Sequence, residues 1–215
     1  MITFAKENAK NLKYVIHGDI ELDKLQINYF SDCAFGGDDM KSRTGFMVTI
    51  SDGFPQGGFQ VLHWGSRVLR RVARSPGAAE ALAVQEHIEI VEGLKKVYDD
   101  FLFGKIMVNL IIDCENLYSS IGGKSVTNEK TPRNVARAIQ NIKDLVANQT
   151  VTNIALISGK DNPADPLTKS VRAETSALMS LMSIQALPRM RGFCWMRKKG
   201  VNQQIADSNA NEQEK

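Results

Sequence analysis

The segment from Ile106 to Ile112 restricts the possible fold more than any other part of the chain. It is nearly all apolar and it ends at Asp113. A strand of this composition is typical of a sheet that is covered on both faces, as in proteins where helices pack against parallel strands. The segment therefore favours a layered α/β architecture.

Three further strands are expected before this segment. Apolar and aromatic runs cover residues 27–34, 45–50 and 58–64, and Gly- and Asp-rich turns separate them. This pattern predicts an antiparallel meander. A long helix should follow, because Ser75 and Pro76 form a helix-start signal, and the helical spacing of apolar residues continues to about Tyr98.

The second half of the chain alternates helices and strands. Thr131 and Pro132 precede a strongly amphipathic helix, and residues 151–157 form a short apolar run. Asn162 and Pro163 open a last expected helix, whose apolar row continues to Met182. The predicted order is βββ-α-β-α-α-β-α, which is an α/β mixture.

Composition is that of an ordinary globular domain with extensions. The chain has 215 residues, of which 43% are hydrophobic and 24% are charged, so one domain is expected. No apolar run approaches the ~20 residues of a membrane-spanning helix, and the amino terminus lacks the apolar stretch of a secretory signal. We therefore expect an intracellular protein, cytoplasmic or nuclear, without membrane partners. Three widely spaced cysteines predict reduced thiols rather than disulfides or a zinc site.

The net charge of +3 conceals two basic clusters. The first lies in a stretch without acids and comprises Arg67, Arg70, Arg71 and Arg74. The second comprises Arg189, Arg191, Arg197, Lys198 and Lys199, after which the chain becomes polar and predicts a disordered tail. Either cluster taken alone is compatible with a solvated surface.

Four acidic residues occupy positions that solvation alone does not explain. Asp32 lies inside the first strand, Glu80 lies on the apolar face of the long helix, Asp113 ends the buried strand, and Asp165 begins the last helix. In a mixed sheet the first strand and the later parallel strand are natural neighbours, so the four side chains could converge. Each acid taken singly could equally be a surface group or a helix cap.

Converging carboxylates repel one another unless a cation lies between them. A ligand set of oxygens without His or Cys favours Mg²⁺, with Mn²⁺ as the alternative, over zinc. Two such ions are the apparatus for in-line attack of water on a phosphodiester. By contrast, His87 lies on the core-facing row of its helix and is expected to be a packed, hydrogen-bonded histidine.

The chain resembles the RNase H domain of copia-type retrotransposon polyproteins from about Leu12 to Ser170. The most specific match is the segment from Ala164 to Lys169 (ADPLTK), which is similar to the family's terminal A-D-x-L-T-K. Further matching segments are Tyr29 to Asp32 (YFSD), Asp39 to Phe46 (DMKSRTGF), His63 to Arg67 (HWGSR), Val72 to Ser75 (VARS), Ala79 to Ala83 (AEALA) and Asp113.

The resemblance implies an RNase H-like fold with a five-stranded mixed sheet, made of the three-stranded antiparallel meander plus two parallel strands and flanked by helices. It also implies a domain over residues 24–188. Residues 1–23 then resemble the linker that joins reverse transcriptase to RNase H, and residues 189–215 are the basic, then disordered, tail. A reverse transcriptase domain or protein is the partner that this arrangement implies.

The resemblance also implies a reaction, endonucleolytic cleavage of the RNA strand of RNA–DNA hybrids that leaves 5′-phosphate and 3′-hydroxyl ends. In that reaction Asp32 bridges two metal ions, Asp165 helps to hold the water-activating ion, and Glu80 and Asp113 complete the second. The first basic cluster, together with Lys41 and Arg43, is then expected to contact the nucleic-acid backbone.

Two alternatives remain at this point. A catalytically inactive remnant that keeps the fold and binds nucleic acid is favoured by the absence of any polymerase segment in the sequence. A transposase or integrase with the same fold fits less well, because those sites have three acids with Glu on a late helix, whereas here Glu80 is second and the last acid is Asp165.

Overall fold

The computed structural model describes residues 24–36, 41–52, 59–102, 104–123 and 131–169. The order of elements is the one that the sequence pattern predicts. The strands are β1 (Gln26–Ala34), β2 (Arg43–Ser51), β3 (Phe59–Val68), β4 (Met107–Ile112) and β5 (Asn153–Leu156). The helices are α2 (Pro76–Leu102), α3 (Glu115–Gly122), α4 (Arg133–Ala147), the 3₁₀ turn η3 (Gly159–Asp161) and α5 (Asp165–Thr168).

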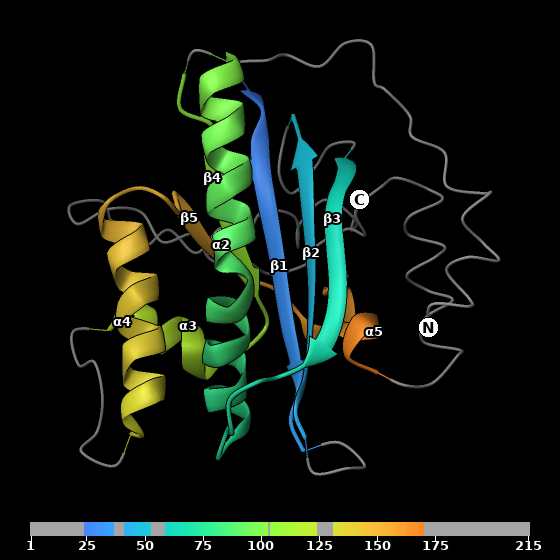
Figure 1. Cartoon of the computed structure of the whole chain (residues 1–215), viewed down its shortest axis with the longest axis vertical. Helices are drawn as coiled ribbons and strands as arrows, with labels where there is room; N and C mark the ends of the chain where they lie inside the picture. The colour runs from blue at the N-terminus through green and yellow to red at the C-terminus, as the bar shows by residue number, and fades with distance from the viewer. Residues whose placement is uncertain (1–23, 37–40, 53–58, 103, 124–130, 170–215) are drawn as a thin grey trace, which may run out of the picture.

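The five strands form one mixed sheet in the order β3-β2-β1-β4-β5. β1 pairs antiparallel with β2, and β2 pairs antiparallel with β3. β4 runs parallel to both of its neighbours, β1 and β5. This confirms the α/β fold class with a three-stranded meander joined to two parallel strands, and it places β1 at the junction between the two halves (Figure 1).

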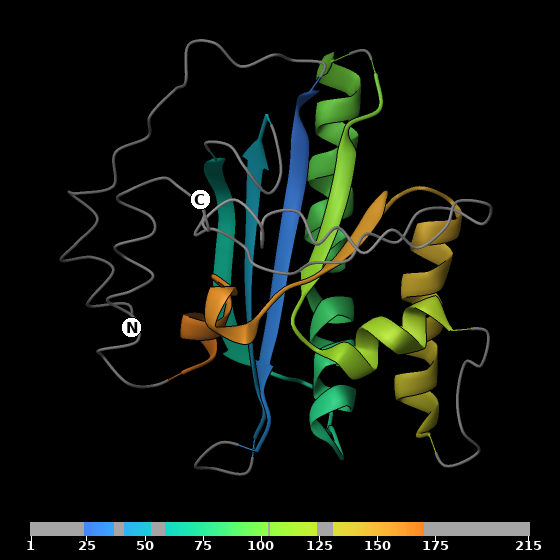
Figure 2. The ribbon, with the colours of Figure 1, turned by 180° about the vertical axis from the view of Figure 1, so that it is seen from behind.

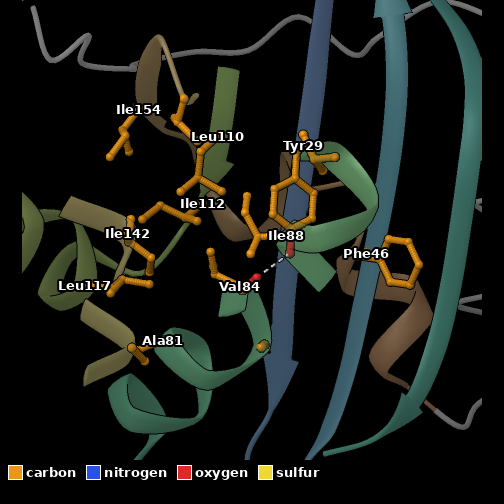
Figure 3. Close-up of a cluster of buried hydrophobic side chains, with 14 of the residues drawn as sticks. Tyr29, Phe46, Ala81, Val84, Ile88, Leu110, Ile112, Leu117, Ile142 and Ile154 are labelled. Carbon is orange, nitrogen blue, oxygen red and sulfur yellow. Dashed lines mark hydrogen bonds between the residues drawn. The ribbon is translucent and has the colours of Figure 1, made fainter. Parts of the chain in front are cut away.

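Helices α2, α3 and α4 lie on one face of the sheet, and their apolar sides form the main core with it (Figures 1 and 2). Tyr29 of β1 is fully buried in this core, and its hydroxyl donates a hydrogen bond of 3.1 Å to the carbonyl oxygen of Val84 in α2 (Figure 3). A buried tyrosine hydroxyl needs such a partner. The bond therefore fixes the position of α2 along β1, and with it the position of the residues at the start of α2.

The start of α2 follows the capping pattern that the sequence indicates. The backbone N–H of Ala78 donates to the hydroxyl oxygen of Ser75 over 3.2 Å, and Pro76 is the first helical residue. A proline is tolerated there because its missing N–H has no intrahelical partner in any case. The helix ends at Leu102 rather than near Tyr98, and β3 continues to Val68 rather than ending at Trp64.

The opposite face of the sheet is covered at one end by the α5 region, as the two views together show. A second core cluster there joins Phe30, Met47 and Ile111 of the sheet with Ala164 and Leu167. The contact is close because β2 carries a glycine at this point. A Cβ atom on that residue, Gly45, would lie only 2.7 Å from the carbonyl oxygen of Ala164.

The expected last helix is wrong in its extent. α5 starts at Asp165 rather than at Asn162 and ends at Thr168, because the backbone of Lys169 is extended (φ −95°, ψ 150°). Asn162 is itself extended, and its side chain bonds to the sheet and to the turn that precedes α5. The side-chain oxygen of Asn162 accepts from the N–H of Ala164, so Asn162 caps the turn that leads into α5 instead of belonging to the helix. The remainder of the expected helix, up to Met182, lies outside the described residues.

A row of buried and half-buried polar side chains crosses four strands on the α5 face. The amide of Asn153 donates to Asn109 over 2.9 Å, Asn109 donates to Asn28 over 2.8 Å, and Asn28 donates to Ser51 over 2.8 Å. Asn109 also donates to the side-chain oxygen of Gln26. β4 is thus buried on both faces as expected, but one of its buried side chains is polar and is paired with those of adjacent strands.

The other domain predictions fall outside the described part of the chain. The linker over residues 1–23, the end of the domain at residue 188 and the tail over residues 189–215 therefore stay predictions. Within the described residues, none of the helices combines the length and the apolar character that crossing a membrane requires.

Candidate active site

Three of the four predicted acids meet at one end of the sheet. Asp32 is near the carboxyl end of β1, and Asp113 directly follows the carboxyl end of the parallel neighbour β4. Glu80 enters from the first turns of α2, on its buried side. One carboxylate oxygen from each of these residues lies within 4.8 Å of the other two. We call these three residues the acidic cluster.

Asp165, the fourth predicted acid, lies outside the acidic cluster. Its Oδ2 is 2.8 Å from the Nζ of Lys169, the residue that follows the end of α5, so the two side chains form an ion pair. Its charge still reaches the cluster, because it contributes to raising the pKa of both Asp32 and Asp113. Within the described residues, the predicted convergence of four acids therefore holds for three of them.

The cluster is electrostatically strained in the absence of a cation. Burial, followed by the charges of Asp32 and Asp113, raises the pKa of Glu80 to about 9. Burial and, to a lesser extent, the charges of neighbouring carboxylates raise the pKa of Asp32 to about 6. A hydrogen bond from Thr168 acts in the opposite direction and lowers this pKa. The pKa of Asp113 is also raised, chiefly by burial. In each carboxyl group the ionised form is therefore disfavoured unless a proton or a cation binds to it.

Each member of the cluster is held by a hydrogen bond from a different part of the chain. The hydroxyl of Thr168 lies 2.7 Å from Oδ2 of Asp32, and the backbone N–H of Cys33 donates to Oε1 of Glu80 over 3.2 Å. The side chain of Asn162 bonds to Asp113 and also donates to the carbonyl oxygen of Ser31 over 3.0 Å. The carboxylates are therefore positioned before any ligand binds.

Sequence reasoning missed Thr168 and Asn162 as supporting residues. Thr168 lies in the ADPLTK segment, so this motif could have indicated it. Only Asp165 is predicted from the motif as a site residue. The sequence pattern indicates only that Asn162 lies at a helix start. Its role becomes visible only when Ser31, which is 131 positions earlier in the chain, lies beside it.

The acidic cluster has the features of a divalent-cation site. Oε2 of Glu80 is buried and has no hydrogen-bond partner among the described residues, so its lone pairs are available to a ligand. A Cβ atom on Gly159 would lie 3.1 Å from Oδ2 of Asp113, so the glycine leaves room beside that oxygen. The three donors are all carboxylates, which hard cations such as Mg²⁺ and Mn²⁺ prefer. The residues present therefore fit such an ion.

The predicted nucleic-acid contacts lie at the same end of the sheet as the acidic cluster. Arg43 pairs across the sheet with Ala34, and Arg67 pairs with Thr44, so both are close in register to Asp32. The rest of the basic segment joins β3 to α2, and it is tied to the helix by two contacts. Arg71 Nη1 donates to Gln85 over 2.9 Å, and Arg70 Nε is 3.8 Å from Glu86. The exposed members are Lys41, Arg67, Arg70, Arg71 and Arg74.

His87 is the packed histidine that the sequence pattern predicts. It is fully buried, its Nε2 lies 2.6 Å from the hydroxyl oxygen of Thr44, and its ring stacks on Phe46 with centroids 4.1 Å apart. Burial, helped by the charge of Arg67, lowers the pKa of His87 to about 4. It is therefore neutral at physiological pH and forms part of the core.

Comparisons with known proteins give matches at the level of three-dimensional structure. No protein-family model matches the chain, and no curated protein sequence matches it. An RNase H1 isolated from compost by a metagenomic approach is 21% identical over 71% of this chain and 98% of its own, with a TM-score of 0.48. The N-terminal RNase H domain of a Mycobacterium tuberculosis protein is 15% identical over 74% of this chain and 97% of its own, with a TM-score of 0.44.

A foamy viral protease–reverse transcriptase, solved in complex with an RNA/DNA hybrid, is also similar. It is 13% identical over 82% of this chain but only 22% of its own length, with a TM-score of 0.39. These are distant similarities. The assignment of a function to this chain therefore depends on its own strand order, its acidic cluster and the basic residues at the same end of the sheet.

Proposed function

We propose that this chain is a metal-dependent ribonuclease H that hydrolyses the RNA strand of RNA–DNA hybrids. The observation that carries the proposal is the acidic cluster, in which Asp32, Glu80 and Asp113 bring carboxylate oxygens within 4.8 Å at one end of a mixed sheet. Such a cluster is costly to bury unless it binds cations, and clustered carboxylates that hold two cations are suited to phosphodiester hydrolysis. Sequence motifs that resemble those of RNase H contain all three residues.

In this proposal the three carboxylates hold two divalent ions, Mg²⁺ or alternatively Mn²⁺. When bound, such ions supply an activated water and stabilise the departing oxygen of the cleaved phosphodiester. The protein contributes orientation. Thr168 fixes one oxygen of Asp32 and leaves the other available, while the N–H of Cys33 fixes Oε1 of Glu80 and leaves Oε2 available.

Asp165 is proposed as a fourth, outer member of the site. Its position at the start of α5, one turn before Thr168, places its charge where it acts on both Asp32 and Asp113. In the structure it is paired with Lys169. To help to hold an ion, its carboxylate would have to leave this partner, and we therefore expect substitution of Asp165 to slow the reaction less than substitution of Asp32.

The basic residues are proposed to contact the phosphate backbone of the hybrid. The set is Lys41, Arg43, Arg67, Arg70, Arg71 and Arg74. Hybrids are recognised by helix shape, phosphates and 2′-hydroxyl groups rather than by base sequence. Binding should therefore be independent of sequence and should weaken as salt rises, because each neutralised phosphate releases counterions.

We further propose that the chain derives from a copia-type retrotransposon. The ADPLTK segment supports this lineage most directly, since it contains both Asp165 and the threonine that holds Asp32. The proposed partner, besides the hybrid itself, is a reverse transcriptase domain or protein. Such an enzyme makes RNA–DNA hybrids, which are the substrate of the proposed reaction.

The test is cleavage of a hybrid whose RNA strand is labelled, in Mg²⁺ and in EDTA. Wild-type protein should cut the RNA strand only with the metal, and Asp32→Asn should abolish the cut while the protein remains folded. Asp144→Asn is the matched control, because it removes an exposed carboxylate on α4, outside the cluster. Metal-independent cleavage, or full activity of Asp32→Asn, would refute the proposal.

The second candidate is an inactive RNase H-like module that binds nucleic acid. The ion pair between Asp165 and Lys169 favours it, because the pair leaves only three carboxylates free to meet. Fluorescence anisotropy with an uncleaved hybrid distinguishes the candidates. Salt-sensitive binding without turnover in either Mg²⁺ or Mn²⁺ supports the module, whereas turnover by the chain alone excludes it.

A further inference from the structure

The connection from the end of β3 to the start of α2 carries three exposed arginines, Arg70, Arg71 and Arg74 (Figure 1). Val72, in the middle of this connection, is 81% exposed, so the connection projects into solvent. We call residues 69–75 the arginine segment. Its three arginines belong to the set that is proposed to contact the hybrid.

Both ends of the arginine segment are fixed by the fold. The backbone N–H of Leu69 donates to the carbonyl oxygen of Ser42 over 2.8 Å, and the side chain of Leu69 is buried in the main core. At the other end, the hydroxyl oxygen of Ser75 accepts from the N–H of Ala78 in α2. The path of the residues between these ends depends on contacts that they make with α2.

Two adjacent residues of α2, Gln85 and Glu86, hold the middle of the segment. The N–H of Arg70 donates to Oε2 of Glu86 over 3.4 Å, and the Nε of Arg70 is 3.8 Å from Oε1. Nη1 of Arg71 donates to Gln85 over 2.9 Å. The same helix carries Glu80 of the acidic cluster, and six residues of an α-helix span about 9 Å along its axis. One rigid element therefore fixes these arginines relative to the acidic cluster.

Stability does not explain why a glutamate occupies position 86. The side chain of Glu86 is only 13% exposed, and its Oε1 is buried without a hydrogen-bond partner among the described residues. A carboxylate buried with so few donors costs stability. The pair with Arg70 compensates little, because the arginine side chain is 79% exposed. A carboxylate beside a surface that binds phosphates also repels the ligand.

The contact with Glu86 leaves the terminal nitrogens of Arg70 available. Glu86 approaches Nε, and within the described part of the chain no partner is found for Nη1 or Nη2. Two nitrogens of one guanidinium can bind two oxygens of a phosphate, which is the geometry that arginine favours. In Arg71, Gln85 occupies Nη1 and leaves Nη2 available.

We propose that Glu86, together with Gln85, positions Arg70 and Arg71 for the phosphate backbone of a bound hybrid. Glu86 holds the backbone and the Nε of Arg70, so this side chain needs less ordering when the ligand binds, and such ordering costs affinity. This role rests on the proposed function, because that function supplies the hybrid as ligand. Glu86 and Gln85 act through the arginines and are positioning residues.

Charge and positioning predict opposite effects for substitution of Glu86. Removal of a negative charge beside a phosphate-binding surface should by itself tighten binding of the anionic hybrid. Loss of positioning should weaken it. We expect Glu86→Ala to weaken hybrid binding about tenfold, as for the loss of one charge-assisted hydrogen bond. Glu86→Gln keeps an oxygen for the N–H of Arg70 and should restore most of the binding.

The experiment measures the dissociation constant of a labelled hybrid by fluorescence anisotropy in EDTA, at several salt concentrations. Glu86→Ala should reduce the dependence of log Kd on log salt by about one phosphate contact. Its effect should be less than additive with that of Arg70→Ala. Gln85→Ala should also weaken binding. The matched control, Glu89→Ala, removes an exposed carboxylate of the same helix and should not weaken binding. Urea unfolding verifies that each variant is folded.

Three outcomes overturn the positioning role. They are binding by Glu86→Ala that equals or exceeds that of wild type, a loss in Glu86→Gln as large as that in Glu86→Ala, and additive effects of Glu86→Ala and Arg70→Ala. If the wild type does not bind the hybrid, the role also fails. If the wild type binds the hybrid but does not cleave it in Mg²⁺, the proposed ribonuclease function fails, while the binding measurements still decide the role of Glu86.

Discussion

Replacing Glu80 with glutamine should remove a pH-dependent loss of stability from the metal-free protein. Burial and the neighbouring carboxylates raise the pKa of Glu80 from 4.5 to about 9. Between these values the folded chain keeps a proton that the unfolded chain has released. The free energy of unfolding contributed by this group is therefore fully present below about pH 4.5 and is lost progressively as the pH rises towards 9.

The size of the effect follows from the difference between the two pKa values. At pH 7 the pH is about 2.5 units above the pKa of 4.5 that Glu80 has in the unfolded chain. Each of these units lowers the free energy of unfolding by ~1.4 kcal/mol, because the unfolded chain has lost a proton that the folded chain keeps. The loss at pH 7 is therefore about 3 kcal/mol. Glutamine resembles the protonated acid, does not titrate, and can still accept the hydrogen bond from the N–H of Cys33 through its Oε1.

The measurement is urea unfolding of wild type and Glu80→Gln at pH 4.5 and pH 7 in EDTA. The stability of the variant relative to wild type should increase by about 3 kcal/mol between the two pH values. Glu89→Gln, which changes an exposed glutamate on the same helix, should follow the wild type. If Glu80→Gln and wild type lose stability in parallel, the reasoning about the acidic cluster is wrong. Addition of Mg²⁺ at pH 7 should stabilise the wild type more than the variant.

Three further predictions use the same unfolding assay. Gly45→Ala should lower the free energy of unfolding by about 2 kcal/mol, because the new Cβ would meet the carbonyl oxygen of Ala164, just before α5. Gly93→Ala, in open space on α2, should raise the free energy of unfolding by up to ~1 kcal/mol, and equal effects of the two substitutions would contradict the close contact. Asn109→Ala should lower the free energy of unfolding by about 3 kcal/mol, since it leaves polar side chains on the adjacent strands without their hydrogen-bond partner. An unchanged urea midpoint would show that the row of amides does not stabilise the fold. The pKa of His87 is lowered from 6.5 to about 4, so stability should be lost as the pH falls through this range, by up to about 3 kcal/mol, and His87→Gln should flatten that slope.

Patterns within single segments of the chain predicted most of the fold. The apolar run at residues 106–112, the start of α2 at Pro76 and the packed position of His87 each depend on neighbours within a few residues or on one helical face. Such patterns are legible because strand and helix periodicities place side chains on faces by geometry alone. The five-stranded mixed sheet was implied by the resemblance to RNase H domains, and the alternation of helices and strands agrees with it, since parallel strands require crossover connections.

The sequence by itself determined the element order, the apolar faces and which carboxylates are candidates for a metal site. Only the tertiary structure decided that Asp165 pairs with Lys169 and that Thr168 holds Asp32. It also decided that α5 ends at Thr168, where the backbone of Lys169 becomes extended. The reason is physical. Periodicity records how a segment meets its own neighbours, but the partner of a buried polar group is chosen by contacts such as that between Asp32 and Thr168, 136 positions apart.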